Sequence, residues 1–168
     1  FLYEISSFPK PIIAEVSGLA VGVGVTCLLH CDFVYAESET KFSLPFVKLG
    51  LCPEAASTLI LPRVSGYLKA AEKLLLGDNF NALDALDMGI VTRIFKAAEL
   101  SEAVKSTCDK LVSLAPNSFK ALAALHNVPA ESAISSSKIQ VLSFTSPMIF
   151  ITSDSPAFSL LLSAIAKP

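Results

Sequence analysis

The amino-acid sequence predicts an α/β fold in which helices cover a mainly parallel sheet. Segments rich in β-branched residues alternate along the chain with segments whose apolar residues recur at helical spacing. The chain has 168 residues, of which 52% are hydrophobic. A chain of this size and composition can bury a sizeable core in one domain of ordinary size.

Short apolar segments, β-branched in the clearest case, predict the strands. Ile12–Val16 follows a proline and is succeeded by Gly18, which suits a buried strand that ends in a turn. The other predicted strands are "DFVYA" at 32–36, "KFSLP" at 41–45 and "IVTRIF" at 90–95. These few strands are not enough for a stable sheet. Further strands are therefore expected either N-terminal to this chain or in segments without a clear pattern.

Glycine, proline and asparagine mark the predicted helices. "VGVTCLLH" at 23–30 fits a short buried helix. Pro53 suits a first helical position, which places Glu54 in the first turn of a helix that runs to Leu61, where Pro62 interrupts it. Further helices are expected at 65–77, which ends at a glycine, at 81–89, which has an Asn cap and a Gly end, at 100–116 and at 116–126.

Serine becomes frequent from Glu131 onward, and the sequence there has no firm period. We therefore divide the chain into a core at 1–125 and a C-terminal helical and serine-rich tail at 126–168 whose elements the sequence does not define. The chain begins at Phe1 without an initiator Met or a recognisable signal peptide, so a processed form or a fragment is expected.

Charge and hydropathy exclude several classes of function. The net charge is −2 and no run of Lys and Arg occurs, so nucleic acid is not an expected partner. The longest nearly apolar windows are too short and too rich in glycine for a membrane span. No second Cys/His cluster joins Cys27, His30 and Cys31 to complete a metal site, so the cysteines are expected to be buried thiols of an intracellular protein and no metal is expected.

The glycine-rich stretch "GLAVGVG" lies between a predicted strand and a predicted helix. Such a turn can direct several backbone N–H groups at a phosphate or a developing oxyanion. The spacing of Gly18, Gly22 and Gly24 matches neither a dinucleotide fingerprint nor a P-loop. The alternative is that these glycines simply allow a helix and a strand to pack closely.

Glu54 is the only charged residue between Leu49 and Leu61. One interpretation is structural, because a Glu in the first turn of a helix stabilises the helix dipole by about 0.3–1 kcal/mol. The other is functional, a general base set in an apolar wall. Neither His30 nor His126 builds a catalytic triad around it, and His30 is expected to be a core residue with a satisfied hydrogen bond.

Several motifs together resemble the enoyl-CoA hydratase/isomerase (crotonase) superfamily. They are "KPIIAEVSG", the glycine-rich turn, "CDFVYA", "LGL" followed by "PE", and "ALDMGIVT", and the resemblance runs from about Phe8 to Ala124. It implies a core of repeated ββα turns arranged in a spiral, with C-terminal helices. It also implies that the N-terminal turns of this spiral are missing from the chain.

The resemblance also assigns roles to residues. Hydratases of the family carry two glutamates at the positions that Thr26 and Phe46 occupy here, so hydration is disfavoured. The Δ3,Δ2-enoyl-CoA isomerase branch carries one glutamate at the position of Glu54. By resemblance, this residue moves a proton from C2 to C4 of a 3-enoyl-CoA, and the N–H of Val23 binds the enolate oxygen.

The same resemblance implies the surroundings of the reaction. The residues expected to line the substrate site are Ala20, Gly22, Gly24, Phe46, Leu51 and Pro53. The family often has Gly where Ala55 stands, so the extra methyl group is expected to narrow the pocket. No cofactor is expected, because CoA is part of the substrate. A homotrimer or hexamer is expected, as is a second oxyanion donor upstream of the position of Phe8.

An alternative to the isomerase is a catalytically silent crotonase-like domain that binds acyl-CoA or assembles with partners. A third possibility is a truncated product without independent function. The sequence does not indicate the acyl chain length. It leaves mitochondrion, peroxisome and bacterial cytoplasm open, since the C-terminus is not a peroxisomal Ser-Lys-Leu signal.

Overall fold

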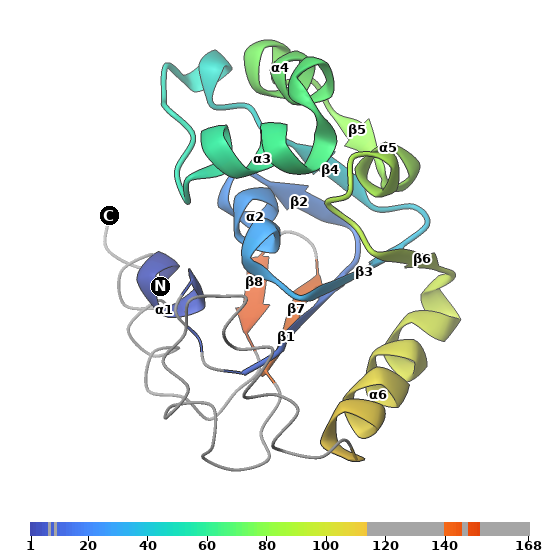
Figure 1. Ribbon diagram of the computed structural model, residues 1–168. Coiled ribbons are helices and arrows are strands. Elements are labelled where there is room, and N and C mark those ends of the chain that lie inside the picture. The colour runs from blue at the N-terminus through green and yellow to red at the C-terminus, as the bar shows by residue number, and fades with distance from the viewer. Residues whose placement is uncertain (7, 9, 114–139, 146–147, 152–168) are drawn as a thin grey trace.

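The computed structural model describes residues 1–6, 8, 10–113, 140–145 and 148–151. These residues form two sheets with helices packed around them, as the predicted α/β class requires (Figure 1). The larger sheet has the strand order β6-β3-β1-β7-β8, and the smaller has the order β2-β4-β5.

The larger sheet is built around β1 (Ile12–Val16), whose bounds match the prediction. β3 (Phe33–Glu37) and β7 (Gln140–Thr145) pair with β1 in parallel on its two sides. β6 (Arg93–Phe95) extends the sheet in parallel beyond β3, and β8 (Met148–Ile151) pairs antiparallel with β7. The strands β7 and β8 lie where the sequence predicted no element, and they supply part of the sheet that the predicted strands left incomplete.

The smaller sheet joins β4 (Lys41–Ser43) in parallel to β2 (Leu19–Val21) and antiparallel to β5 (Phe80–Asn81). Phe42 and Phe80 are paired in register, and their stacked rings lie 5.5 Å apart between centroids. The sequence did not predict β2 and β5, because two or three residues are too few to show an alternating pattern.

Helices lie on both faces of the larger sheet. Their bounds are α1 (Leu2–Ser6), α2 (Val23–Thr26), the 3-10 helix η1 (Cys27–His30), the 3-10 helix η2 (Val47–Leu49), α3 (Ser57–Ser65), α4 (Tyr67–Leu76), α5 (Ala82–Asp87) and α6 (Ala97–Ser113). Alternate residues of β1 point to opposite faces. Ile13 packs with Leu100 and Val104 of α6, whereas Ala14 packs in the cluster that contains Leu28 of η1. The helical pair α2–η1 is therefore buried against the face opposite α6 (Figure 1).

The helix predicted to begin at Pro53 begins instead at Ser57 and ends at Ser65. Ala55 and Ala56 have left-handed backbones, with φ of 56° and 52°, which a right-handed helix cannot contain. Pro62 does not stop α3 but lies inside it, so the helix forgoes one backbone hydrogen bond there. Glu54 consequently belongs to the loop before the helix, not to its first turn.

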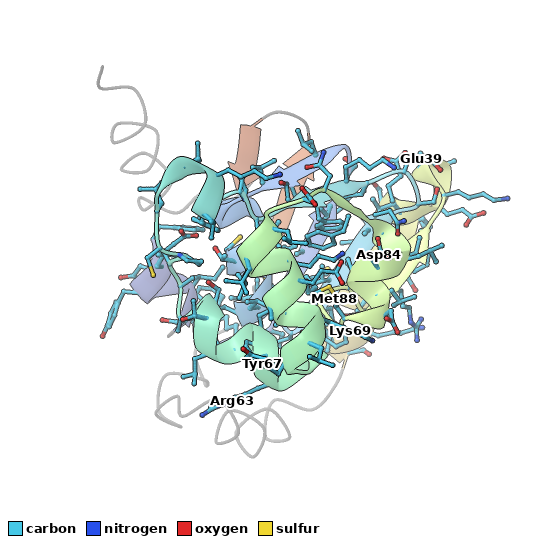
Figure 2. All side chains as sticks on the ribbon, turned by 90° about the horizontal axis from the view of Figure 1, so that it is seen from above. Glu39, Arg63, Tyr67, Lys69, Asp84 and Met88 are labelled. Carbon is cyan, nitrogen blue, oxygen red and sulfur yellow. The ribbon has the colours of Figure 1, made fainter. Side chains whose placement is uncertain are left out.

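The other predicted helix ends agree well with the structure. Gly77 closes α4 in the left-handed conformation, and Asn81 begins α5 with a capping box that includes Asp84. Lys69 of α4, labelled in Figure 2, forms an ion pair of 2.6 Å with Asp87, the last residue of α5. α6 begins at Ala97, three residues earlier than predicted. The predicted helix at 116–126 and the boundary between 125 and 126 lie outside the described residues.

Cysteine burial differs from the prediction at one position. Cys27 is fully buried, Cys31 and Cys108 are half-buried, and Cys52 is exposed on the loop before Glu54. The expectation of buried thiols is therefore wrong for Cys52. Within the described part of the chain no group of His, Cys, Asp and Glu has the arrangement of a metal site. No helix in that part is both long and apolar enough to cross a bilayer.

Candidate active site

The glycine-rich turn ends at Gly22, which caps the N-terminus of α2. Gly22 has φ 57° and ψ −117°, a backbone conformation that L side chains rarely adopt. Its N–H donates to the carbonyl of Ser43 in β4, and its own carbonyl accepts from the N–H groups of Val25 and Thr26. The first N–H groups of a helix have no partner inside the helix. The turn therefore presents the N–H of Val23 as a donor that α2 itself does not use.

Glu54 lies opposite α2. The hydroxyl of Thr26 donates to Oε1 of Glu54 at 2.5 Å. Thr26 is fully buried, and Glu54 is half-buried. The carboxylate is thus directed at α2, and no side chain caps α3. Glu54 is therefore not a first-turn residue that stabilises the α3 dipole, and that interpretation is wrong.

The backbone around Glu54 is held by two further side chains. Ser57 donates through both its N–H, at 3.1 Å, and its hydroxyl, at 2.6 Å, to the carbonyl of Glu54. Nε2 of His30 lies 2.8 Å from the carbonyl oxygen of Ala55. A carbonyl oxygen only accepts, so this nitrogen carries the hydrogen. The expectation that His30 has a satisfied hydrogen bond is confirmed, but His30 is half-buried and is not a core residue.

Thr26 and His30 both bind the Glu54 loop, which the sequence did not predict. They are four residues apart in the helical pair α2–η1, and both side chains reach the same loop. The sequence shows two hydrogen-bonding side chains within an otherwise apolar segment, but it does not indicate what they bind.

The predicted pocket residues are only partly brought together. Phe46 is buried, and its Cζ would lie 3.8 Å from a Cβ added at Gly22. Ala20 is also buried, and its Cβ would lie 3.9 Å from a Cβ added at Gly24. Leu51 donates its N–H to the carbonyl of Phe46 at 2.8 Å, but its side chain is 58% exposed. Pro53 is half-buried. That these residues line the substrate site stays a prediction.

The Cys27 thiol lies near Glu54. Burial raises the pKa of the Cys27 thiol from 9.0 to about 12, and the nearby Glu54 carboxylate adds to the rise. The thiol is therefore neutral at ordinary pH. The buried polar residues in the described part of the chain are Thr26, Thr40, Ser43 and Ser57, and none is a carboxylate. A carboxylate anchored by Thr26 can move a proton, and a first-turn N–H such as that of Val23 can stabilise an anion.

Comparison with known proteins identifies the family. The enoyl-CoA hydratase/isomerase family model matches residues 1–150. Enoyl-CoA delta isomerase 2 of Rattus norvegicus is 39% identical over 120 residues, which cover 71% of this chain and 31% of the relative. Carnitinyl-CoA dehydratase of Salmonella typhi is 34% identical over 130 residues, which cover 77% of this chain and 50% of the relative.

Solved structures share the fold. An enoyl-CoA hydratase/isomerase from Pseudoalteromonas atlantica T6c matches with a TM-score of 0.73 and 41% identity, covering 79% of this chain and 53% of that one. The chain spans half or less of the length of the two curated relatives named above. The family match, the relatives and the shared fold together show that the chain belongs to the enoyl-CoA hydratase/isomerase (crotonase) family.

Proposed function

We propose that the chain carries the proton-transfer machinery of an enoyl-CoA isomerase, which moves the double bond of a 3-enoyl-CoA to the 2-enoyl position. The observation that carries the proposal is the carboxylate of Glu54, held at 2.5 Å by the buried Thr26. A relative named enoyl-CoA delta isomerase 2 supports it at 39% identity.

Glu54 acts first as a base and then as an acid. Its carboxylate removes a proton from C2, next to the thioester carbonyl, and returns the proton to C4. One carboxyl group suffices because the reaction consumes no water and has one mobile proton. The half-buried position of Glu54 suits a step from which water is best kept away.

Val23 stabilises the intermediate. Loss of the C2 proton places negative charge on the thioester oxygen, and fixed donors aimed at such an oxygen lower the barrier. Thr26, whose side chain binds Glu54, lies three residues after Val23, about 4.5 Å further along the helix. The donor and the base therefore approach the reacting carbons from one short helical segment and the loop beside it.

Hydration and dehydration are the competing reactions, and a relative named carnitinyl-CoA dehydratase raises the question. By family resemblance they depend on the carboxylates that Thr26 and Phe46 replace. Both residues are buried, and neither side chain can exchange a proton with water as a carboxyl group does. We infer that the chain does not catalyse addition of water.

We also propose that the protein works as a homotrimer or hexamer. Exposed apolar side chains on α3 and α4 support an assembly, because such patches commonly mark an interface. They are Leu59, Val64, Tyr67, Leu68, Leu75 and Leu76.

The experiment that tests the function is the substitution Glu54→Gln, with Glu39→Gln as its matched control. Gln keeps the shape of the side chain but cannot carry the proton. Glu39 is exposed in the turn between β3 and β4 (Figure 2). We expect Glu54→Gln to abolish isomerisation of a 3-enoyl-CoA while sparing CoA binding, and Glu39→Gln to behave as the wild type. Turnover retained in Glu54→Gln would contradict the assignment.

A further inference from the structure

Glu54 has two carboxylate oxygens, and the proposed reaction uses one of them twice, at C2 and then at C4. We propose that Thr26 is the positioning residue for this step: its hydroxyl binds Oε1 and leaves Oε2 to carry the proton. The inference rests on the proposed function of Glu54, and it adds a role for a residue at which a hydratase would carry a carboxylate.

The contact itself is well suited to fix one oxygen. Oγ1 of Thr26 donates to Oε1 at 2.5 Å, and a hydrogen bond to an ionised acceptor is stronger than one between neutral groups. Thr26 is 0% exposed, so bulk water has no access to compete for its hydroxyl. A β-branched side chain in a helix has few rotamers, so the hydroxyl is pre-oriented and the carboxylate must come to it.

Thr26 also connects Glu54 to the proposed oxyanion donor. The backbone N–H of Thr26 donates to the carbonyl of Gly22 at 3.0 Å, and Gly22 is the cap that presents the N–H of Val23. One residue is thus bonded through its backbone to the donor turn and through its side chain to the base. This double connection sets where the base lies relative to the thioester oxygen.

The Glu54 loop is fixed independently of the Thr26 hydroxyl. His30 donates to the carbonyl of Ala55 at 2.8 Å, and the hydroxyl of Ser57 donates to the carbonyl of Glu54 at 2.6 Å. Removing the Thr26 hydroxyl therefore frees the carboxylate to rotate without releasing the backbone that carries it. This separation makes the positioning role testable by one isosteric change.

Thr26 neither gives nor takes a proton during the reaction. Oε2 takes the C2 proton, the C–H electron pair forms the C1=C2 bond of the enolate, and the carbonyl pair moves to oxygen. The carbonyl then re-forms, C2=C3 forms, and the pair of C3=C4 takes the proton from Oε2 at C4. The Thr26 hydroxyl keeps its hydrogen throughout, and nothing is oxidised or reduced.

The test compares Thr26→Val, which removes the hydroxyl at nearly constant shape, with Thr26→Ser, which keeps it. Misplacing a catalytic group by about 1 Å can cost roughly 100-fold, so kcat for a 3-enoyl-CoA is expected to fall about 10- to 100-fold in Thr26→Val with KM nearly unchanged. Thr26→Ser is expected to restore most of kcat. A merely structural Thr26 would instead tolerate Val at least as well as Ser, and that outcome would overturn the proposal.

A second measurement does not depend on turnover. With isotope-labelled glutamate, the carboxyl carbon resonance of Glu54 is assigned by its disappearance in Glu54→Gln. It is expected to shift in Thr26→Val and to stay near the wild-type position in Thr26→Ser. If the wild-type chain is inactive, the proposed function fails, and this resonance still decides whether Thr26 holds the carboxylate: an unchanged resonance in Thr26→Val overturns the positioning role.

Discussion

At the scale of single residues, the loop that carries Glu54 is held in an unfavourable conformation. Ala55 and Ala56 both have positive φ, and the left-handed region costs an L residue roughly 1–2 kcal/mol. Hydrogen bonds from Thr26, His30 and Ser57 to this loop offset that cost. Strained backbone of this kind often accompanies a functional site, and here it directs a carboxylate toward α2 instead of toward the helix that follows.

Cys27 is buried beside Glu54, and its raised pKa predicts a loss of stability in alkali. Below about pH 9 the thiol keeps its proton in both the folded and the unfolded chain, so its contribution is constant. Between pH 9.0 and about 12 the unfolded chain has lost the proton and the folded chain has not. The free energy of unfolding therefore falls as the pH rises through this window, by roughly 1 kcal/mol per pH unit for this one group.

Urea unfolding between about pH 8 and pH 11 measures this effect. Cys27→Ala is expected to lose less stability over the window than the wild type, whereas Cys52→Ala, which removes an exposed thiol, is expected to follow the wild type. Cys31, whose pKa burial also raises, is present in all three proteins. Equal slopes in Cys27→Ala and the wild type would show that the Cys27 thiol ionises alike in both states.

At the scale of elements, the glycine and asparagine positions allowed several helix ends to be predicted. Gly77 and the Asn81 cap bound α4 and α5 as expected, because each supplies a local interaction that needs no tertiary context. The start of α3 was predicted wrongly. Pro53 is a good first helical residue in isolation, but Ala55 and Ala56 have positive φ, and His30, distant in sequence, binds the carbonyl of Ala55 and holds this loop outside the helix.

The capping box of α5 gives a prediction at this scale. The side chain of Asn81 accepts from the N–H of Asp84 at 2.9 Å, and the side chain of Asp84 accepts from the N–H of Asn81 at 3.1 Å. Asn81→Ala is expected to lower the free energy of unfolding by about 1 kcal/mol, as lost caps do. Asn79→Ala, an exposed change before the cap, is the control for chemical denaturation. A loss no larger than that of the control would mean that the small sheet alone fixes this helix.

At the scale of the whole molecule, the sequence predicted the fold class, most helices and the family, but not the complete sheets. β1 and β3 are largely buried and rich in β-branched or aromatic residues, so their patterns are visible, whereas β2 and β5 are too short to show one. β7 and β8 come from a serine-rich segment without a period, and they are identified as strands by the pairing of β7 with β1 and with β8. For the site, Glu54 and Val23 were selected by resemblance, but the Thr26 contact depends on tertiary structure and could not be derived from spacing.

The central claim is that one carboxylate, without a second acid or base, shifts a double bond and adds no water. The most direct test offers the purified chain a 3-enoyl-CoA and, separately, a 2-enoyl-CoA. The account predicts formation of the conjugated 2-enoyl product from the first and negligible hydration of the second. A well-folded chain that leaves the 3-enoyl-CoA unchanged, or that hydrates the 2-enoyl-CoA robustly, would contradict it.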